Sequence, residues 1–399
     1  MEIIMKYILP SAVVCLLLVP CLHAEETATF IELGDPAGER VAFVAFSPDG
    51  KKIITTNTQY IAKIWDIETG KELQKFDDTI NRETENLTTY YGHNVKLSAA
   101  DFSPDGKRVA TISWERFARV WDVESGKELH KLKGHNSEVR SIAFSPDGKN
   151  IVTAARDGTA RIWDADSGRE LRKFSHPVGT VSPGTLFPPA SAAFSPDGKK
   201  IVTFIHDASG PNSIRVWDTH TGEMLLELKA DISINASPVF SPDGKKIVAV
   251  VDNRNGGNVK IWDAGSGKEL HELGPHNGID RRVVSLSADG KKLVTVSSGT
   301  PQIWDVDTGK KLPVKLQELS HGVFFSLSPD GKKVIALPPD SSTTIRIWDA
   351  DTGKNLHTLD GHHWNLFRPV FSPDGKRVVV TDGDTHHGVV IYTRIWVLD

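Results

Sequence analysis

Residues 145–169, SPDGKNIVTAARDGTARIWDADSGR, decide the fold. The stretch opens on Ser-Pro-Asp-Gly, a tight turn in which Pro presets φ at the first corner, Asp bonds its own backbone and Gly takes the left-handed position. Short, alternating, β-branched segments follow at 149–153 and 159–163, and the second ends in an apolar-Trp-Asp triplet. With similar segments at 139–144 and 170–174, the stretch and its flanks predict four short strands.

The same unit recurs eight times along the chain. The turn tetrapeptide begins at Ser47, Ser103, Ser145, Ser195, Ser241, Ser287, Ser328 and Ser372, with Ala in place of Pro in the sixth unit. The repeat tryptophans that follow are Trp65, Trp121, Trp163, Trp217, Trp262, Trp304, Trp348 and Trp396. A second tight turn, such as Ser167-Gly168-Arg169, follows several of them. Each unit of 41 to 56 residues therefore predicts four antiparallel strands, named a to d in chain order.

This repeat resembles the WD-repeat family of β-propellers, and the resemblance covers residues 27–399. It implies an all-β fold, an eight-bladed WD-repeat β-propeller with four-stranded antiparallel blades. We expect a single propeller domain over residues 25–399. The regular, lysine-rich repeats resemble exported bacterial members of the family. Propellers host many unrelated functions, so the fold alone assigns none.

The two ends of the repeat region complement each other. The eighth unit stops at residues 395–399, after strand c and before any strand d. Residues 27–33 have strand character and belong to no unit. We expect residues 27–33 to supply the missing outer strand and close the ring, because an open strand edge templates pairing with another chain.

The N-terminal segment differs in kind from the repeats. Lys6 precedes an apolar run over residues 7–22, and Ala24 is a small residue before two glutamates. This order is typical of a secretory signal peptide, and the run is short for a membrane span. The sequence predicts a signal peptide over residues 1–24 and a secreted or periplasmic protein with no membrane span after processing. An uncleaved anchor and a lipid anchor are the alternatives, and Met5 is a second candidate start.

Composition narrows the function classes. The 399-residue chain has a formal net charge of −4, which disfavours the broad positive surface that nucleic-acid binding needs. Both cysteines, Cys15 and Cys21, lie in the expected signal peptide, so the mature chain would have neither a disulfide nor a catalytic thiol. No Gly-x-Ser-x-Gly elbow, phosphate loop or His-Glu-x-x-His motif occurs. We therefore expect no catalytic residue, no cofactor and no nucleic-acid partner.

Several conspicuous polar residues are expected to be structural. In the family that the repeat resembles, a His after strand d, a hydroxyl on strand b, an Asp in the b–c loop and the repeat Trp form one network. Unit three matches this network with His135, Thr153, Asp157 and Trp163, and unit two comes close with His93, Thr111, Glu115 and Trp121. We interpret both sets as buried hydrogen-bonded networks, because an unpaired buried polar atom costs about 1–3 kcal/mol. The alternative is a hydrolytic His–Asp pair beside a hydroxyl.

One face of the predicted ring collects the sequence variation. The a–b and c–d turns share one face and are nearly uniform, whereas the b–c and d–a loops share the other and carry every sizeable insertion. We call the second face the top face. Loops on a rigid scaffold gather binding residues, and the resemblance implies partner contacts at the start of strand a and just before the b–c acid. Those positions are Arg40, Lys96, Trp114, Glu138, Arg140, Arg156, Asp280, Arg282, His321, Asn365 and Phe367.

The eleven top-face residues also have a simpler interpretation, in which they form a solvated rim and their aromatic side chains cover the loop bases.

Unit eight contains an unusual group of candidate metal ligands. Imidazoles and carboxylates gather in two of its top-face loops, a combination that suits zinc, copper or nickel. These weak candidates are His362, His363, Asp382, Asp384, His386 and His387. A polar loop with surplus histidines is the favoured interpretation, and we expect no metal.

The sequence therefore predicts a non-catalytic scaffold that binds a protein or peptide through the top-face loops in an exported or cell-envelope compartment. We expect it to act as a monomer. A propeller enzyme with a site over the central channel is one alternative, and it requires titratable groups from several blades to converge. A glycan-binding lectin is the other, and it requires exposed aromatics paired with carboxylates.

Overall fold

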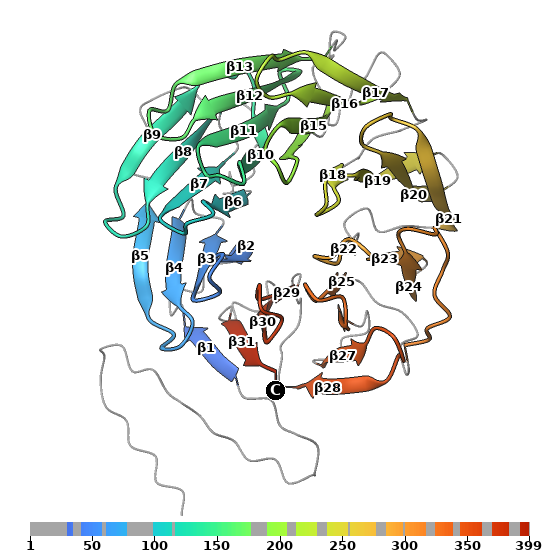
Figure 1. The fold of residues 1–399 in the computed structure, drawn as a ribbon. Coiled ribbons are helices and arrows are strands. Elements are labelled where there is room, and N and C mark those ends of the chain that lie inside the picture. Colours follow the sequence, from blue (N-terminus) through green and yellow to red (C-terminus); the bar gives the residue numbers. More distant parts are fainter. Residues whose placement is uncertain are drawn as a thin grey trace, which may run out of the picture.

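The computed structural model describes residues 30–34, 41–57, 61–77, 99–113, 116–176, 190–205, 213–229, 238–253, 256–276, 285–297, 300–316, 324–337, 344–360, 369–382 and 392–398. All regular elements in these ranges are β-strands joined by turns. Eight separate sheets surround a central axis, and neighbouring sheets stand side by side around the ring (Figure 1). Within the described ranges, a helix long and apolar enough to cross a membrane does not occur. The predicted all-β, eight-bladed propeller is confirmed.

The blades follow one another in chain order, and within each blade the chain starts at the inner strand a and runs outward. Blade six has three strands, and β1 (Phe30–Gly34), from the N-terminal side, supplies the outer strand of blade eight. Blade one holds β2 (Val41–Phe46), β3 (Lys52–Asn57), β4 (Ile61–Asp66) and β5 (Glu72–Asp77), and blade two holds β6 (Ala99–Phe102), β7 (Arg108–Ile112), β8 (Phe117–Asp122) and β9 (Glu128–Lys133). Blade three holds β10 (Val139–Phe144), β11 (Asn150–Ala155), β12 (Thr159–Asp164) and β13 (Glu170–Ser175), and blade four holds β14 (Ala190–Phe194), β15 (Lys200–Ile205), β16 (Ser213–Asp218) and β17 (Met224–Lys229). Blade five holds β18 (Val239–Phe240), β19 (Lys246–Asn253), β20 (Gly256–Asp263) and β21 (Glu269–His276), and blade six holds β22 (Ser285–Leu286), β23 (Lys292–Ser297) and β24 (Thr300–Asp305). Blade seven holds β25 (Phe324–Leu327), β26 (Lys333–Leu337), β27 (Ile345–Asp349) and β28 (Asn355–Leu359), and blade eight holds β29 (Val370–Phe371), β30 (Arg377–Asp382), β31 (Tyr392–Val397) and β1 (Phe30–Gly34).

The turn tetrapeptide forms the same hydrogen-bonded turn in every blade. In blade three, Ser145 Oγ donates to Asp147 Oδ1 at 2.6 Å, and the Lys149 N–H donates to the same oxygen at 3.0 Å. Gly148 has a φ of 69°, which a residue with a Cβ adopts only with strain. These contacts close the a–b turn without help from other blades, so the turns are determined locally by the sequence.

The hydrophobic core lies in the seams between neighbouring blades. Trp163, for example, packs in a cluster with Val120 and Leu132 of blade two and with Ile142 of its own blade. Each of the other repeat tryptophans likewise lies in the cluster between its blade and the preceding one. Because removing a buried Trp side chain typically costs about 3–5 kcal/mol, these residues hold the blades together.

Blade six departs from the regular pattern at its outer position. Its sheet has three strands, and the segment that follows β24 contacts it through a single bridge between Trp304 and Lys311. The Leu312 N–H donates to the Ile303 carbonyl at 2.8 Å. Pro313 comes next, and a proline has no N–H to continue a ladder of hydrogen bonds.

The N-terminal strand lies beside the C-terminal one. β1 pairs antiparallel with β31, with Phe30 opposite Trp396 and Leu33 opposite Thr393 (Figure 1). The Phe30 ring packs against Trp396 in a tilted arrangement, with a centroid distance of 4.7 Å. Leu33 is buried in the cluster that also contains Trp65 of blade one. β1 therefore occupies the outer position of blade eight, and its contribution to ring stability stays a prediction.

Candidate functional site

Three of the eleven predicted partner-binding residues lie in the described part of the chain, and the structure brings these three together. Glu138 Oε2 lies 2.8 Å from Arg140 Nη2 and 2.8 Å from Arg156 Nη1. The Arg156 N–H also donates to the Glu138 carbonyl at 3.0 Å. Arg140 is on β10, the innermost strand of blade three, and Arg156 directly follows β11. We call these residues the blade-three cluster.

The blade-three cluster is half-buried. The side chains of Glu138, Arg140 and Arg156 are 25%, 19% and 10% exposed. Desolvation raises the pKa of Glu138 although Arg140 lies beside it, and desolvation lowers the pKa of Arg140. Charges in such a position interact more strongly with a partner than charges in open solvent do. Guanidinium groups there can donate to carboxylates or carbonyls in a fixed fork geometry.

The other eight predicted partner-binding residues fall outside the described ranges. They are Arg40, Lys96, Trp114, Asp280, Arg282, His321, Asn365 and Phe367. Their role stays a prediction that rests on the sequence.

The four predicted network residues of blade three form one hydrogen-bonded chain. The Trp163 Nε1–H donates to Thr153 Oγ1 at 2.8 Å, and Thr153 Oγ1 lies 2.8 Å from His135 Nε2. The carboxylate of Asp157 is ionised and can only accept, so Nδ1 of His135 carries the proton of this contact. That Nδ1–H then donates to Asp157 Oδ2 at 3.0 Å.

Asp157 is the last residue of this hydrogen-bonded network and accepts several further hydrogen bonds. It also accepts from the Asn136 N–H at 2.9 Å and from Thr159 Oγ1 at 2.6 Å. These donors outweigh desolvation and hold the pKa of Asp157 far below its usual range. Asp157 thus joins the d–a loop at Asn136 to the b–c loop that carries Arg156.

The buried position of these residues supports the structural interpretation over the hydrolytic one. The His135 side chain is fully buried, and Thr153 is 1% exposed. The Thr153 hydroxyl is committed to both Trp163 and His135. A substrate carbonyl has no access to a hydroxyl in this position.

Blade two shows part of the same arrangement. The Trp121 Nε1–H donates to Thr111 Oγ1 at 2.9 Å, and blades one, four and six repeat this Trp-to-Thr bond. The remaining members predicted for blade two, His93 and Glu115, lie outside the described residues.

Blade four contains a network that the sequence prediction missed. His176 Nε2 lies 2.7 Å from Thr203 Oγ1, which accepts from the Trp217 Nε1–H at 2.8 Å. Burial lowers the pKa of His176 to about 3, so the ring is neutral at physiological pH. His176 follows Ser175, whereas the predicted histidines follow a Gly, and the b–c segment of this blade is longer than in blade three. Thr203 on strand b was the sequence feature that could have indicated this network.

The candidate metal loops of blade eight lie almost entirely outside the described residues. This applies to His362, His363, Asp384, His386 and His387, while the backbone of Asp382 ends β30. Within the ranges that the structure covers, no group of three or more His, Cys, Asp or Glu side chains could hold a metal ion. The weak metal-ligand candidates in these loops stay a prediction from the sequence.

Comparisons with known proteins agree with this architecture. A family model described as the TolB beta propeller domain matches residues 186–393, more than half of the chain. A second model, the WD domain G-beta repeat, matches residues 84–122 and 126–164. The crystal structure of the computationally designed Ika8 protein is similar with a TM-score of 0.67 and 23% sequence identity, over 90% of this chain and 97% of that one. At this identity the likeness shows the fold alone.

Proposed function

The chain belongs to the WD-repeat and TolB-type β-propellers, and from this premise we propose that it is a non-catalytic, monomeric scaffold that binds a protein or peptide through its top face. Propellers of this kind are generally protein-interaction scaffolds and usually lack catalytic activity. The observation that carries the proposal is the blade-three cluster. In this cluster Arg140 lies on β10, the inner strand of blade three, and the neighbouring Glu138 and Arg156 belong to the d–a and b–c segments that the sequence assigns to the top face.

The blade-three cluster has the properties of a preorganised contact point. Arg140 lies on β10, Glu138 directly precedes this strand and Arg156 directly follows β11, and a backbone hydrogen bond joins Arg156 to Glu138. Asp157, the residue after Arg156, is held by hydrogen bonds from His135, Asn136 and Thr159. Rigid side chains lose little conformational entropy on binding, and arginine is enriched among the residues that dominate interface energies.

We expect the double substitution Arg140→Ala and Arg156→Ala to weaken partner binding at least tenfold, because a central interface arginine typically contributes about 1.5 kcal/mol or more. A partner captured with the wild-type protein from a cell-envelope extract is identified, and its affinity for each variant is then measured. Lys173→Ala is the matched control, because Lys173 is an exposed cation on the outer strand of the same blade. Equal affinities for the wild-type protein and the double variant would place the binding surface elsewhere.

The proposed compartment is the cell envelope. The TolB-like domain is typical of periplasmic proteins. Residues 1–24 lie outside the described part of the chain, so the proposal that they form a signal peptide rests on Lys6 and the apolar run that follows. We expect the mature protein to begin at Glu25. Mass spectrometry of the protein from a periplasmic fraction tests this, and an intact Met1 or Met5 contradicts it.

A further inference from the structure

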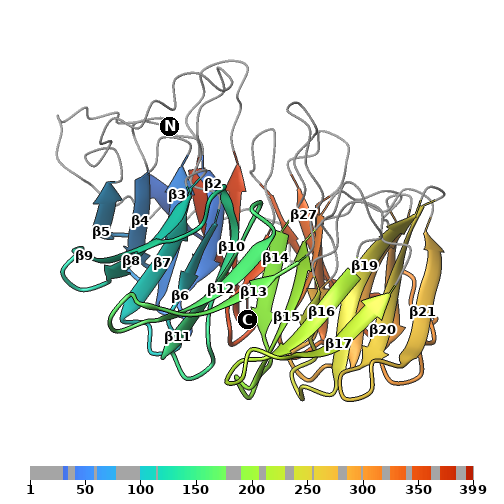
Figure 2. The ribbon, with the colours of Figure 1, turned by 90° about the horizontal axis from the view of Figure 1, so that it is seen from above.

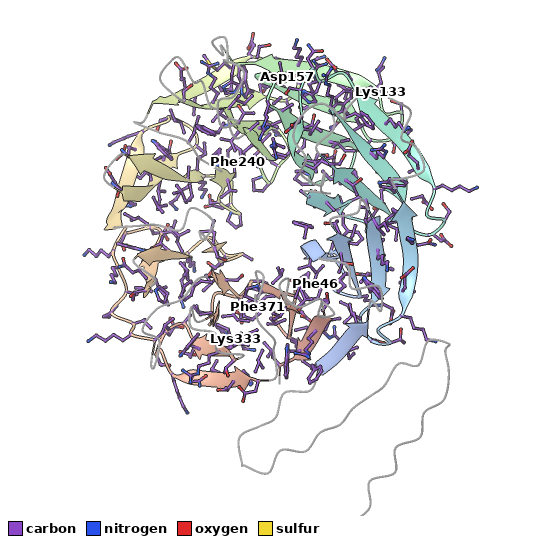
Figure 3. All side chains as sticks on the ribbon, turned by 180° about the vertical axis from the view of Figure 1, so that it is seen from behind. Phe46, Lys133, Asp157, Phe240, Lys333 and Phe371 are labelled. Carbon is purple, nitrogen blue, oxygen red and sulfur yellow. The ribbon has the colours of Figure 1, made fainter. Side chains whose placement is uncertain are left out.

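One carboxylate stands out on the inner strands, two residues before the turn tetrapeptide. The equivalent positions in the eight blades are Ala45, Asp101, Ala143, Ala193, Val239, Ser285, Ser326 and Val370. Asp101 is half-buried on β6, and its Oδ2 accepts a hydrogen bond from the Phe144 N–H of β10 at 2.8 Å. This bond crosses the seam between blades two and three near the central axis. Phe46, Phe240 and Phe371, the counterparts of Phe144 in blades one, five and eight, likewise lie toward the centre of the ring (Figure 3).

A neutral residue makes the same bond elsewhere in the ring. Ser285 Oγ of blade six accepts from the Leu327 N–H of blade seven at 3.0 Å. Leu327 holds the place in its blade that Phe144 holds in blade three. A hydroxyl is therefore sufficient to bind the N–H of the inner edge strand, and the charge of Asp101 is not required for that contact.

Among the described residues, the strands packed against β6 provide no Lys or Arg side chain that forms an ion pair with Asp101. These elements are β2, β3, β7 and β10. β2 has no charged residue, and Lys52 at the start of β3 lies near the carboxylates of its own turns. Arg108 at the start of β7 donates to the Gly148 carbonyl at 2.8 Å and pairs with Asp166, while Arg140 of β10 pairs with Glu138. Within the described residues, no ion pair reaches Asp101.

The carboxylate of Asp101 therefore loses solvation without gaining a counter-charge. Desolvation raises its pKa to about 6, against the smaller lowering effects of the Phe144 and Phe102 backbone N–H groups. A neutral carboxyl still accepts the Phe144 hydrogen bond through its carbonyl oxygen, so protonation removes the desolvation cost and keeps the contact.

We propose that the seam between blades two and three, joined by Asp101 and Phe144, is a proton-controlled contact that is tight when Asp101 is protonated and opens more readily when Asp101 is ionised. The closed seam holds the proton more tightly than an opened seam in which water reaches the carboxylate. Protonation of Asp101 therefore gives the closed seam additional stability. This stability is fully present below the pKa of Asp101 in the opened seam, near 4, and is lost as pH rises through about 6, its pKa in the closed seam. The blades therefore separate locally more often at neutral pH than at pH 5.

Amide hydrogen exchange measured at pH 5 and pH 7.5, corrected for the intrinsic rates, tests the proposal. We expect the protection of the Phe144 amide to fall about tenfold between the two values, as linkage predicts for a pKa that moves from near 4 to about 6. The Leu327 amide, whose acceptor is the neutral Ser285, is the internal control and should not change. The variant Asp101→Ser copies the Ser285 arrangement and should remove the pH dependence at Phe144.

Two results would overturn the proposal. The first is equal pH dependence of the Phe144 and Leu327 amides in the wild-type protein. The second is a carboxyl carbon resonance of Asp101 that titrates near 4 in the folded protein. Asp101→Asn serves as a second neutral variant if the serine variant folds poorly, and it should also remove the pH dependence.

Discussion

Replacing Asp157 by Ala is expected to lower the free energy of unfolding by about 2–4 kcal/mol at pH 7, which is a large effect for a single polar side chain. Asp157 accepts hydrogen bonds from His135, Asn136 and Thr159 in a nearly closed environment. The substitution leaves these donors without their acceptor, and it removes the bond that joins the d–a loop to the b–c loop of blade three. The strands β10, β11 and β12 that these loops connect lie side by side in Figure 2. Chemical denaturation of the mature protein and its variant measures the difference.

The pH dependence of this difference has a defined sign. The pKa of Asp157 lies well below its usual range because its hydrogen bonds favour the ionised form. For a carboxyl with a lowered folded pKa, the stabilisation is present above the unfolded pKa near 4 and is lost as pH falls toward the folded value. The gap between the wild-type protein and Asp157→Ala should therefore narrow below about pH 4.

Trp114→Ala is the control for Asp157→Ala. The sequence places Trp114 just before the acid of the b–c loop in unit two, where the side chain is expected to face a partner or solvent. Its removal should leave the melting temperature nearly unchanged. Equal losses of melting temperature for the two variants would mean that the Trp114 side chain stabilises the fold as Asp157 does.

Removing residues 25–33 is expected to lower the melting temperature by about 5–10 °C and to cause self-association. The deletion takes away most of β1 and exposes the outer edge of β31, because residues 30–33 pair with that strand. It also removes Leu33, which is 2% exposed, from the cluster between blades eight and one. Light scattering and thermal unfolding report the two consequences separately.

Leu33→Ala separates loss of core from loss of strand pairing. This variant keeps the backbone of β1 on β31 and removes only buried apolar volume. It should lose about 2–4 kcal/mol of stability and remain a monomer. If the truncated protein also remains a monomer and melts at the full-length temperature, β1 does not close the ring.

The sequence alone determined the architecture because its signals are local and repeated. Each turn tetrapeptide closes on its own Ser, Asp and Gly, so the a–b turns need no tertiary context. Eight repeat tryptophans at the same place in the unit then fix the number of blades, since each fills one seam. The resemblance to the WD-repeat family implied the network from Trp163 to Asp157, and these residues form it. These features depend on residues within one repeat and its immediate flanks.

The tertiary structure decided the side-chain contacts that form between two blades or that involve loops of unequal length. The sequence named Glu138, Arg140 and Arg156 separately, and only the pairing of β10 with β11 brings their charges within 3 Å. It missed His176, because the network of blade four uses a shifted position and a longer b–c segment. It gave no sign that Asp101 reaches Phe144 across a seam, because those residues lie 43 positions apart in different repeats. A repeat pattern reports what each unit shares, whereas a contact between units depends on how their sheets twist and pack, and that geometry exists only in the closed ring.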